Sequence, residues 1–204
     1  MAVLGFIYAF PAHAEQSMCS YTSYDWNTYT KASVNHRKIS HLYSMNQPYE
    51  IHQATGCTVC EQDQIEISLP GVSGFKVCKF LAANIKTALS TATKNGAKIF
   101  LVTAYRVGMT KGDIDSTGIR TQFSNHSFGI AIDINAEQNG LYDHCIQFGP
   151  ACRLIRGGAW QPDQVGSLTA NSQLVIAFSQ IGLKWGGKIQ GQQKDFMHFS
   201  PNGY

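Results

Sequence analysis

The chain has 204 residues, with 16 Lys and Arg against 13 Asp and Glu, which gives a formal net charge of +3. This length suits a single domain, and a hydrophobic content of 44% is too high for a disordered chain. The small net charge argues against nucleic-acid binding, and no apolar run is long enough for a membrane span. We therefore expect one globular domain, acting as a monomer, with neither nucleic acid nor a membrane span.

Residues 1–14 (MAVLGFIYAFPAHA) contain eleven apolar residues and no charged residue, and they end in Ala12-His13-Ala14. An apolar stretch before a small-x-small site is the pattern of a secretory signal. We therefore expect cleavage near Ala14 and a periplasmic or secreted protein. No Lys or Arg precedes the apolar run, so a buried N-terminal strand or helix is the alternative.

An even number of cysteines in an exported chain suggests disulfides. Cys145 and Cys152 are the first expected pair, because they close a short loop rich in Gly and Pro. A redox-active or zinc-binding role for the C-x-x-C pair at Cys57 and Cys60 is the alternative. The six disulfide candidates are Cys19, Cys57, Cys60, Cys78, Cys145 and Cys152.

Residues 15–63 are interpreted as an N-terminal extension that packs on the domain formed by residues 64–204. The extension is rich in Tyr, Ser, Thr and His and shows no clear hydrophobic period. Its histidines, His36, His41 and His52, are expected to be surface or half-buried side chains.

Residues 64–78 alternate between apolar and polar around a Pro70-Gly71 turn, which predicts two short strands. A stripe of apolar residues at helical spacing then runs from Leu81 to Ala92. This stripe predicts a helix, with Asn95-Gly96 as its C-terminal stop.

Buried strands are predicted over residues 98–105 and 129–134, and a short strand over residues 183–185. A long loop region, residues 136–170, lies between them, followed by a helix over residues 174–181. The elements show no regular alternation of strand and helix, so the predicted fold class is α+β.

The segment SNHSFGIAID and the later segment DFMH carry candidate metal ligands: His126, Asp133 and His198. Three protein ligands with a fourth position open suit zinc in a hydrolase, whereas two histidines are a poor match to calcium. Side chains seven residues apart on a strand point to opposite faces. We therefore expect His126 in the loop before the strand that carries Asp133, with Gly129 allowing the bend.

These segments, read as S-x-H-x-x-G-x-A-x-D and D-x-x-H-F, resemble the VanY/VanX-type family of zinc D,D-peptidases. That family includes D-alanyl-D-alanine carboxypeptidases and dipeptidases and L-alanyl-D-glutamate endopeptidases. Thr103–Arg106 (TAYR) is similar to the family's S-G-Y-R-S segment, and Trp185-Gly186-Gly187 precedes the last motif. The resemblance covers about residues 98–199. It implies a hedgehog-like α+β fold with a small antiparallel sheet, flanking helices and long loops.

The resemblance also implies one zinc ion bound by His126, Asp133 and His198. Asp195 matches the general base of the family, and Arg106 matches the arginine that holds the scissile carbonyl. Such roles agree with physical chemistry, because zinc acidifies bound water, a carboxylate accepts its proton, and a guanidinium stabilises an oxyanion.

Four further residues are candidates for supporting roles. Ser124 and Trp185 are expected to orient ligands or to form a wall of the site, and Tyr105 precedes the motif arginine. Arg120 is an alternative to Arg106 for binding the anionic oxygen. In addition, the long loop is a candidate for substrate contact, through Asn135, Asn139 and Tyr142.

The function expected from these observations is a zinc metallopeptidase that acts on peptidoglycan stem peptides. A D-alanyl-D-alanine carboxypeptidase is the first hypothesis, and an L-alanyl-D-glutamate or cross-link endopeptidase is the second. The second stays open because Asp195 stands where the carboxypeptidase branch often carries Glu.

Two other classes of protein compete with a zinc peptidase. One is a non-catalytic zinc module that binds peptidoglycan or a protein, against which the retained Asp195 argues. The other is a serine D,D-peptidase, suggested by an S-x-x-K match at Ser73 and Lys76 but without the S-D-N and K-T-G segments of that class.

Overall fold

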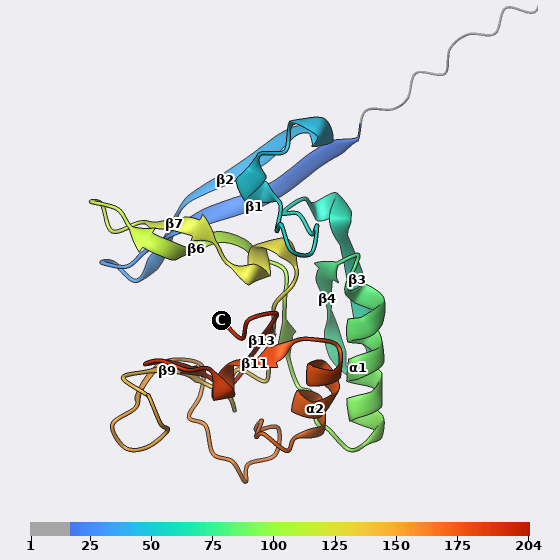
Figure 1. The fold of residues 1–204 in the computed structure, drawn as a ribbon, viewed down its shortest axis with the longest axis vertical. Coiled ribbons are helices and arrows are strands. Elements are labelled where there is room, and N and C mark those ends of the chain that lie inside the picture. Colours follow the sequence, from blue (N-terminus) through green and yellow to red (C-terminus); the bar gives the residue numbers. More distant parts are fainter. Residues whose placement is uncertain (1–16) are drawn as a thin grey trace, which may run out of the picture.

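Residues 17–204, the part of the chain that the computed structural model describes, form thirteen strands and two α-helices (Figure 1). The expected secretory signal, residues 1–14, lies outside the described residues. The strands of the first half are β1 (Met18–Asn27), β2 (Ala32–Leu42), β3 (Gln64–Leu69), β4 (Val72–Cys78), β5 (Val102–Thr103), β6 (Val107–Ile114) and β7 (Arg120–Phe123). The strands of the second half are β8 (Ile132–Ile134), β9 (Leu141–Asp143), β10 (Arg153–Arg156), β11 (Lys184–Trp185), β12 (Lys194–Asp195) and β13 (His198–Ser200). The helices are α1 (Ala82–Lys94) and α2 (Gln173–Gln180). Small sheets, two helices and long loops confirm the predicted α+β class.

An N-terminal hairpin, which sequence analysis did not foresee, forms part of a four-stranded sheet in the order β2-β1-β6-β7. Strand β1 alternates between buried and exposed positions, but two of its buried residues are the polar Ser23 and Asp25. Strand β2 is largely exposed. The hairpin therefore carries no hydrophobic alternation in its sequence, although its backbone is regular.

The β3–β4 hairpin and helix α1 follow, as the sequence predicts. Helix α1 buries the expected apolar stripe and lies beside α2 (Figure 1). The side chains of Val77, Ile85, Leu89 and Phe178 are fully buried in the main core that these elements share.

A second antiparallel sheet, in the order β11-β13-β8-β5, crosses the middle of the molecule. Two of its strands are shorter than predicted. Strand β5 begins only at Val102, because the backbone N–H groups of Phe100 and Leu101 donate to the side chain of Asn135 instead of to a strand. Strand β8 begins only at Ile132, after Gly129 turns the chain with a φ of 65°.

The long loop region contains a small hairpin, β9–β10, and β12 pairs with β9. The expectation that its polar residues contact substrate is wrong. Asn135 and Asn139 are fully buried, and their amides bond to the backbone, including the carbonyl of Gly166. Tyr142 is also buried, and its hydroxyl accepts a hydrogen bond from the backbone N–H of Trp160.

All six cysteines lie within the described residues and form disulfides, and the expected Cys145–Cys152 pair is among them. The other two disulfides join Cys19 to Cys60 and Cys57 to Cys78. Cys57 and Cys60 therefore bond to different partners, which overturns the redox or zinc alternative for the C-x-x-C pair. From residue 17 onwards, no helix is long and apolar enough to cross a membrane.

Candidate metal centre and active site

His126 lies on a short 3₁₀ helix (Asn125–Phe128) immediately before β8, as expected from its spacing to Asp133. Gly129 ends this turn in the left-handed region, which strains a residue with a side chain. A Cβ atom at Gly129 would also lie only 2.6 Å from the backbone nitrogen of Cys78. Glycine at this position therefore allows the His126 turn to pack directly against β4.

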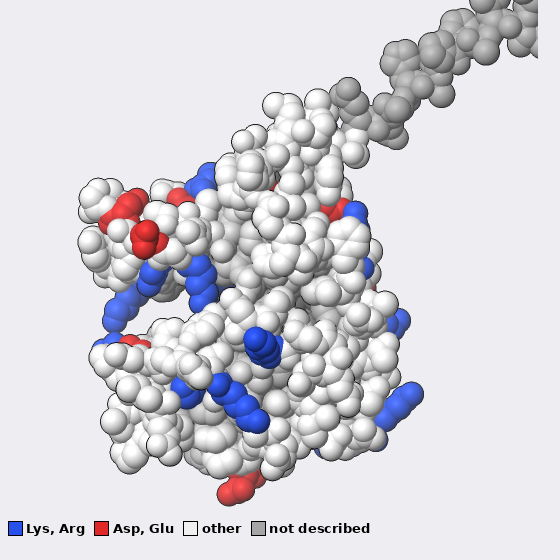
Figure 2. Space-filling model, viewed as in Figure 1, with Lys and Arg blue, Asp and Glu red and all other residues white. Residues whose placement is uncertain are grey.

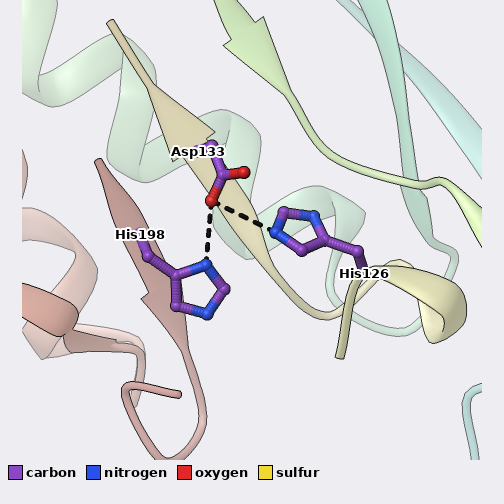
Figure 3. A group of neighbouring side chains, drawn as sticks. All are labelled: His126, Asp133 and His198. Carbon is purple, nitrogen blue, oxygen red and sulfur yellow. Dashed lines mark hydrogen bonds and ion pairs between the residues drawn. The ribbon is translucent and has the colours of Figure 1, made fainter. Parts of the chain in front are cut away.

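Asp133 and His198 face each other across the β8–β13 pair, in which they are directly opposed. His198 Nδ1 lies 2.8 Å and His126 Nε2 lies 3.1 Å from the same oxygen, Asp133 Oδ1 (Figure 3). All three side chains are buried, and one potential ligand atom from each lies within 4.8 Å of the others. Segments far apart in the chain thus bring three potential metal ligands to one point.

The hydrogen bonds of His126 show that this group fits a metal cation. Its Nδ1 lies 2.7 Å from the carbonyl oxygen of Ala104, which can only accept, so Nδ1 carries a proton. In the neutral ring, Nε2 then directs a lone pair at the carboxylate of Asp133. Two acceptors facing each other repel unless a cation lies between them. A ligating histidine whose other nitrogen donates to a carbonyl is the usual arrangement at zinc sites.

In both histidines, burial lowers the pKa and the negative charge of Asp133 raises it, with a different net result for each. Burial lowers the pKa of His126 below its usual value, although the charge of Asp133 partly opposes this effect. Burial also disfavours the charged form of His198, but its hydrogen bond to Asp133 and the charges of Asp133 and Asp195 raise its pKa overall.

The surroundings shift the pKa values of the two carboxyl groups of the site in opposite directions. Burial disfavours ionised Asp133, but the charges and hydrogen bonds of His126 and His198 outweigh it and hold its pKa well below the usual range. Asp195, on β12, is half-buried and lacks such bonds, and partial loss of solvent raises its pKa to about 6. Its Oδ1 atom is inaccessible to solvent and has no hydrogen-bond partner in the described chain.

Arg106 follows β5 and lies beside the same group. Its Nη2 atom is 3.4 Å from Asp133 Oδ2, and its backbone N–H donates to the carbonyl of His126. Its Nη1 atom donates to the hydroxyl of Tyr24 over 3.3 Å. The geometry thus places the motif arginine next to the potential metal ligands.

Residues 117–201, less than half of the chain, match the family model described as D-alanyl-D-alanine carboxypeptidase. This segment is therefore similar to that peptidase family. The match includes His126, Asp133, Asp195 and His198, and it confirms the resemblance on which the sequence analysis relies. Comparisons with curated proteins and with solved structures give no significant match.

The other residues singled out in the sequence lie around the candidate site in different ways. Trp185 is buried, and its indole N–H donates to the carbonyl of Phe196, two residues before His198. Ser124 is buried beside the His126 turn, and its hydroxyl has no hydrogen-bond partner between residues 17 and 204. The hydroxyl of Tyr105 donates to the carbonyl of Val59, away from the ligands.

Three basic side chains near the site, those of Arg120, Lys111 and Arg156, contribute positive charge. The Arg120 guanidinium donates to the carbonyl of Gly112. Lys111, an exposed residue of β6, has a lowered pKa, because partial desolvation and the positive charges of Arg120 and Arg106 outweigh the opposing charge of Asp195. The positive charge of Arg156 acts on Asp195 in turn. Figure 2 shows Lys and Arg side chains lining a hollow on this side of the molecule.

No motif in the sequence marks Tyr24, Lys111 or Arg156 as residues near the site. Tyr24 is 82 positions from Arg106 in the chain and lies in a segment without a recognisable motif. Lys111 lies in a segment of mixed polar and apolar residues, where a lysine is usually a solvated side chain. Only the pairing of β1 with β6 and the return of β12 beside β9 bring these residues to the site.

Proposed function

We propose that this chain is a zinc-dependent D-alanyl-D-alanine carboxypeptidase that hydrolyses peptidoglycan stem peptides. The observation that carries the proposal is the buried group of His126, Asp133 and His198, in which a histidine lone pair faces a carboxylate oxygen. Three nitrogen and oxygen ligands with a further position open is the arrangement of catalytic zinc. The family match over residues 117–201 supports the peptidase class.

In this proposal each polar residue of the site has a separate role. A bound zinc ion supplies Lewis acidity, which polarises the scissile carbonyl and acidifies water. Asp195 accepts the proton of the attacking water and delivers it to the leaving amine. The guanidinium of Arg106 donates to the carbonyl oxygen as that atom gains negative charge.

The basic side chains favour a substrate with a free carboxylate near the cleaved bond. The charges of Lys111 and Arg156 act on Asp195, and those of Arg120 and Arg106 act on Lys111. A carboxypeptidase binds a C-terminal carboxylate next to the scissile bond, which matches this positive charge. The endopeptidase alternative rests on Asp195 itself, since the carboxypeptidase branch often has Glu at that position.

A non-catalytic zinc module is less well supported. Asp195 is half-buried, with its Oδ1 atom inaccessible to solvent, and desolvation raises its pKa to about 6. A carboxyl group at such a position costs stability and is useful for proton transfer near neutral pH. A site that only holds a metal for structural reasons has no need of it.

We also infer that the protein functions outside the cytoplasm, in the periplasm or after secretion. Three disulfides within one small domain support an oxidising compartment. The apolar N-terminal segment of residues 1–14, which is expected to be a cleaved signal, agrees with this location.

Digestion of purified sacculi followed by mass spectrometry of the muropeptides tests the activity. Removal of one terminal D-alanine from pentapeptide stems is the expected result, and cut stems or cut cross-links support the endopeptidase instead. Parallel measurement of bound metals is expected to find one zinc ion per chain. Intact muropeptides after incubation with the zinc-loaded protein contradict both peptidase activities.

A further inference from the structure

The guanidinium of Arg106 is held between two groups from different parts of the chain. One is Asp133, which is also a candidate metal ligand, and the other is the hydroxyl of Tyr24 on the N-terminal hairpin. We propose that Tyr24 is a positioning residue that aims Arg106 at the substrate carbonyl. The N-terminal hairpin, which lies outside the family match, then completes the active site; this inference rests on the proposed function.

The contact with Tyr24 is built into the sheet. Strands β1 and β6 run parallel, and Tyr24 is paired with Gly108, two residues after Arg106. A Cβ atom at position 108 would lie 2.5 Å from Cζ and 2.8 Å from the neighbouring ring carbons of Tyr24. The backbone of Gly108 is thus free of a side chain where the phenol ring lies against it. On β2, His36 stacks on the same ring, with the centroids 5.8 Å apart and the planes 25° apart.

The same glycine also ties this arrangement to the potential metal ligands. Ser127, the neighbour of His126, accepts a hydrogen bond from the N–H of Gly108 through its hydroxyl and donates one to the carbonyl of Gly108. Gly108 therefore contacts the Tyr24 ring through one surface and holds the His126 turn through its backbone. Displacing Tyr24 is expected to affect Arg106 directly, without removing any ligand.

Two properties of Arg106 make the Tyr24 contact important. The carboxylate of Asp133 also faces two histidines, so its attraction for Arg106 is shared with them. The Nε atom of Arg106 is buried and has no hydrogen-bond partner within residues 17–204. The phenol is consequently the one side-chain partner, in the described chain, that fixes the guanidinium from outside the ligand group.

Steady-state kinetics on a synthetic peptide ending in D-alanyl-D-alanine test the inference with the zinc-loaded full chain. In Tyr24→Phe, kcat is expected to fall about tenfold, equivalent to about 1.4 kcal/mol, with KM within twofold of the wild type. When Tyr24→Phe is added to an Arg106→Lys variant, kcat is expected to stay at the value of Arg106→Lys alone. A kcat within twofold of the wild type in Tyr24→Phe overturns the proposal.

Two tyrosines of the same hairpin are matched controls. Tyr21 is buried and its hydroxyl donates to Glu50, so Tyr21→Phe is expected to lower the melting temperature but not kcat. Tyr29 is 70% exposed, and Tyr29→Phe is expected to change neither. Tyr24→Phe is expected to keep the wild-type melting temperature, which separates positioning from stability.

A second measurement does not depend on the peptidase activity. Nuclear magnetic resonance of the Arg106 guanidinium is expected to show slow rotation of the group in the wild type. Faster rotation is expected in Tyr24→Phe and also in Gly108→Ala, in which the added methyl displaces the ring. Unchanged Arg106 signals in both variants overturn the positioning role. If the wild type releases no D-alanine, the proposed function fails, and the guanidinium signals still decide the role of Tyr24.

Discussion

Asp195 is half-buried, and its Oδ1 atom is inaccessible to solvent and has no hydrogen-bond partner among the described residues. Burial raises its pKa to about 6, the negative charge of Asp133 acts in the same direction, and the positive charge of His198 opposes them. A carboxylate with this pKa is mostly ionised at neutral pH and is a stronger base than an ordinary aspartate. The residue is thereby suited to accept a proton and to return it within one catalytic cycle.

The proposed role of Asp195 predicts the pH dependence of the reaction. The base must be ionised to accept a proton, so kcat/KM is expected to rise as the pH increases through about 6 and then to level off. In Asp195→Asn, kcat is expected to fall by about 10²–10⁴ and this acidic limb to disappear. Pre-steady-state and steady-state rates on the D-alanyl-D-alanine peptide between pH 4.5 and pH 8 provide the measurement, with zinc content as the control. Wild-type activity in Asp195→Asn contradicts the role.

The potential metal ligands lead to a second prediction for single residues, because removal of the cation leaves the His126 lone pair against Asp133. Chelation is therefore expected to lower the melting temperature, and added zinc to restore it. A ligand present at 1,000 times its dissociation constant stabilises the folded state by about 4 kcal/mol. Thermal unfolding with and without chelator is the measurement.

His126→Ala is expected to lose the response to chelator, since one of the three ligand side chains is gone. His144→Asn is the matched control, because the His144 side chain is 62% exposed and lies outside the ligand group. Asparagine also tolerates the positive φ of 49° at that position. Identical melting curves of the wild type with and without chelator would argue against a metal at this site.

At the scale of elements, the sequence predicts those that bury one apolar face. Helices α1 and α2 and strand β4 each show a stripe or an alternation, because their inward positions carry apolar side chains. The β1–β2 hairpin escapes prediction because its inward positions include Ser23 and Asp25, and Asp25 is buried as an ion pair with Arg37. Polar groups paired inside a sheet leave no hydrophobic period.

The residues of the candidate site also fall into those that the sequence predicts and those that it does not. Its ligands and Asp195 stand in short motifs whose spacing reflects local turns, so the motif predicts them without knowledge of the fold. Tyr24 has no local signal, since it reaches Arg106 only through the parallel pairing of β1 with β6. Contacts of this kind depend on the path of the whole chain, which a single sequence does not reveal.

The attachment of the N-terminal hairpin depends on Glu50, which is fully buried. Its carboxylate accepts hydrogen bonds from the Tyr21 hydroxyl at 2.5 Å and from the backbone N–H of Gln47 at 2.7 Å, and it lies 3.0 Å from His41 Nε2. Burial raises the pKa of Glu50, but these hydrogen bonds outweigh it and lower the pKa overall. The ionised carboxylate thus stabilises the folded hairpin.

This network predicts how stability depends on pH. Because the pKa of Glu50 is lower in the folded chain, its contribution is fully present above the unfolded value of about 4.5 and is lost as the pH falls through the folded value. Glu50→Gln is expected to reduce the free energy of unfolding by about 1–3 kcal/mol at pH 7 and by less at pH 3.5. Urea unfolding at both pH values is the measurement, and an equal loss at the two would contradict the assignment.

On the scale of the whole molecule, two disulfides connect the N-terminal hairpin to β4, the strand that packs against the His126 turn. Cys19–Cys60 joins β1 to the turn before β3, and Cys57–Cys78 joins that turn to β4. The backbone N–H of Cys78 donates to the carbonyl of Gly129, directly after the His126 turn. The hairpin, the cystine-linked turn and the site thus form one continuous arrangement, in which the motif-bearing half is supported by the other half.

This arrangement predicts that residues 98–204, which contain all the motif residues, do not fold alone. The truncation removes Val77, Ile85 and Leu89, whose fully buried side chains belong to the same core as Phe178 and Phe199. Burial of such side chains contributes about 1.5–3 kcal/mol each, and a whole domain is stable by only about 5–15 kcal/mol. Far-UV circular dichroism and the dispersion of amide resonances are the measurements, with residues 17–204 as the folded control. A truncated chain with dispersed resonances and bound zinc would mean that the motif-bearing half is an independent unit, and that the N-terminal half serves the site without being required for its fold.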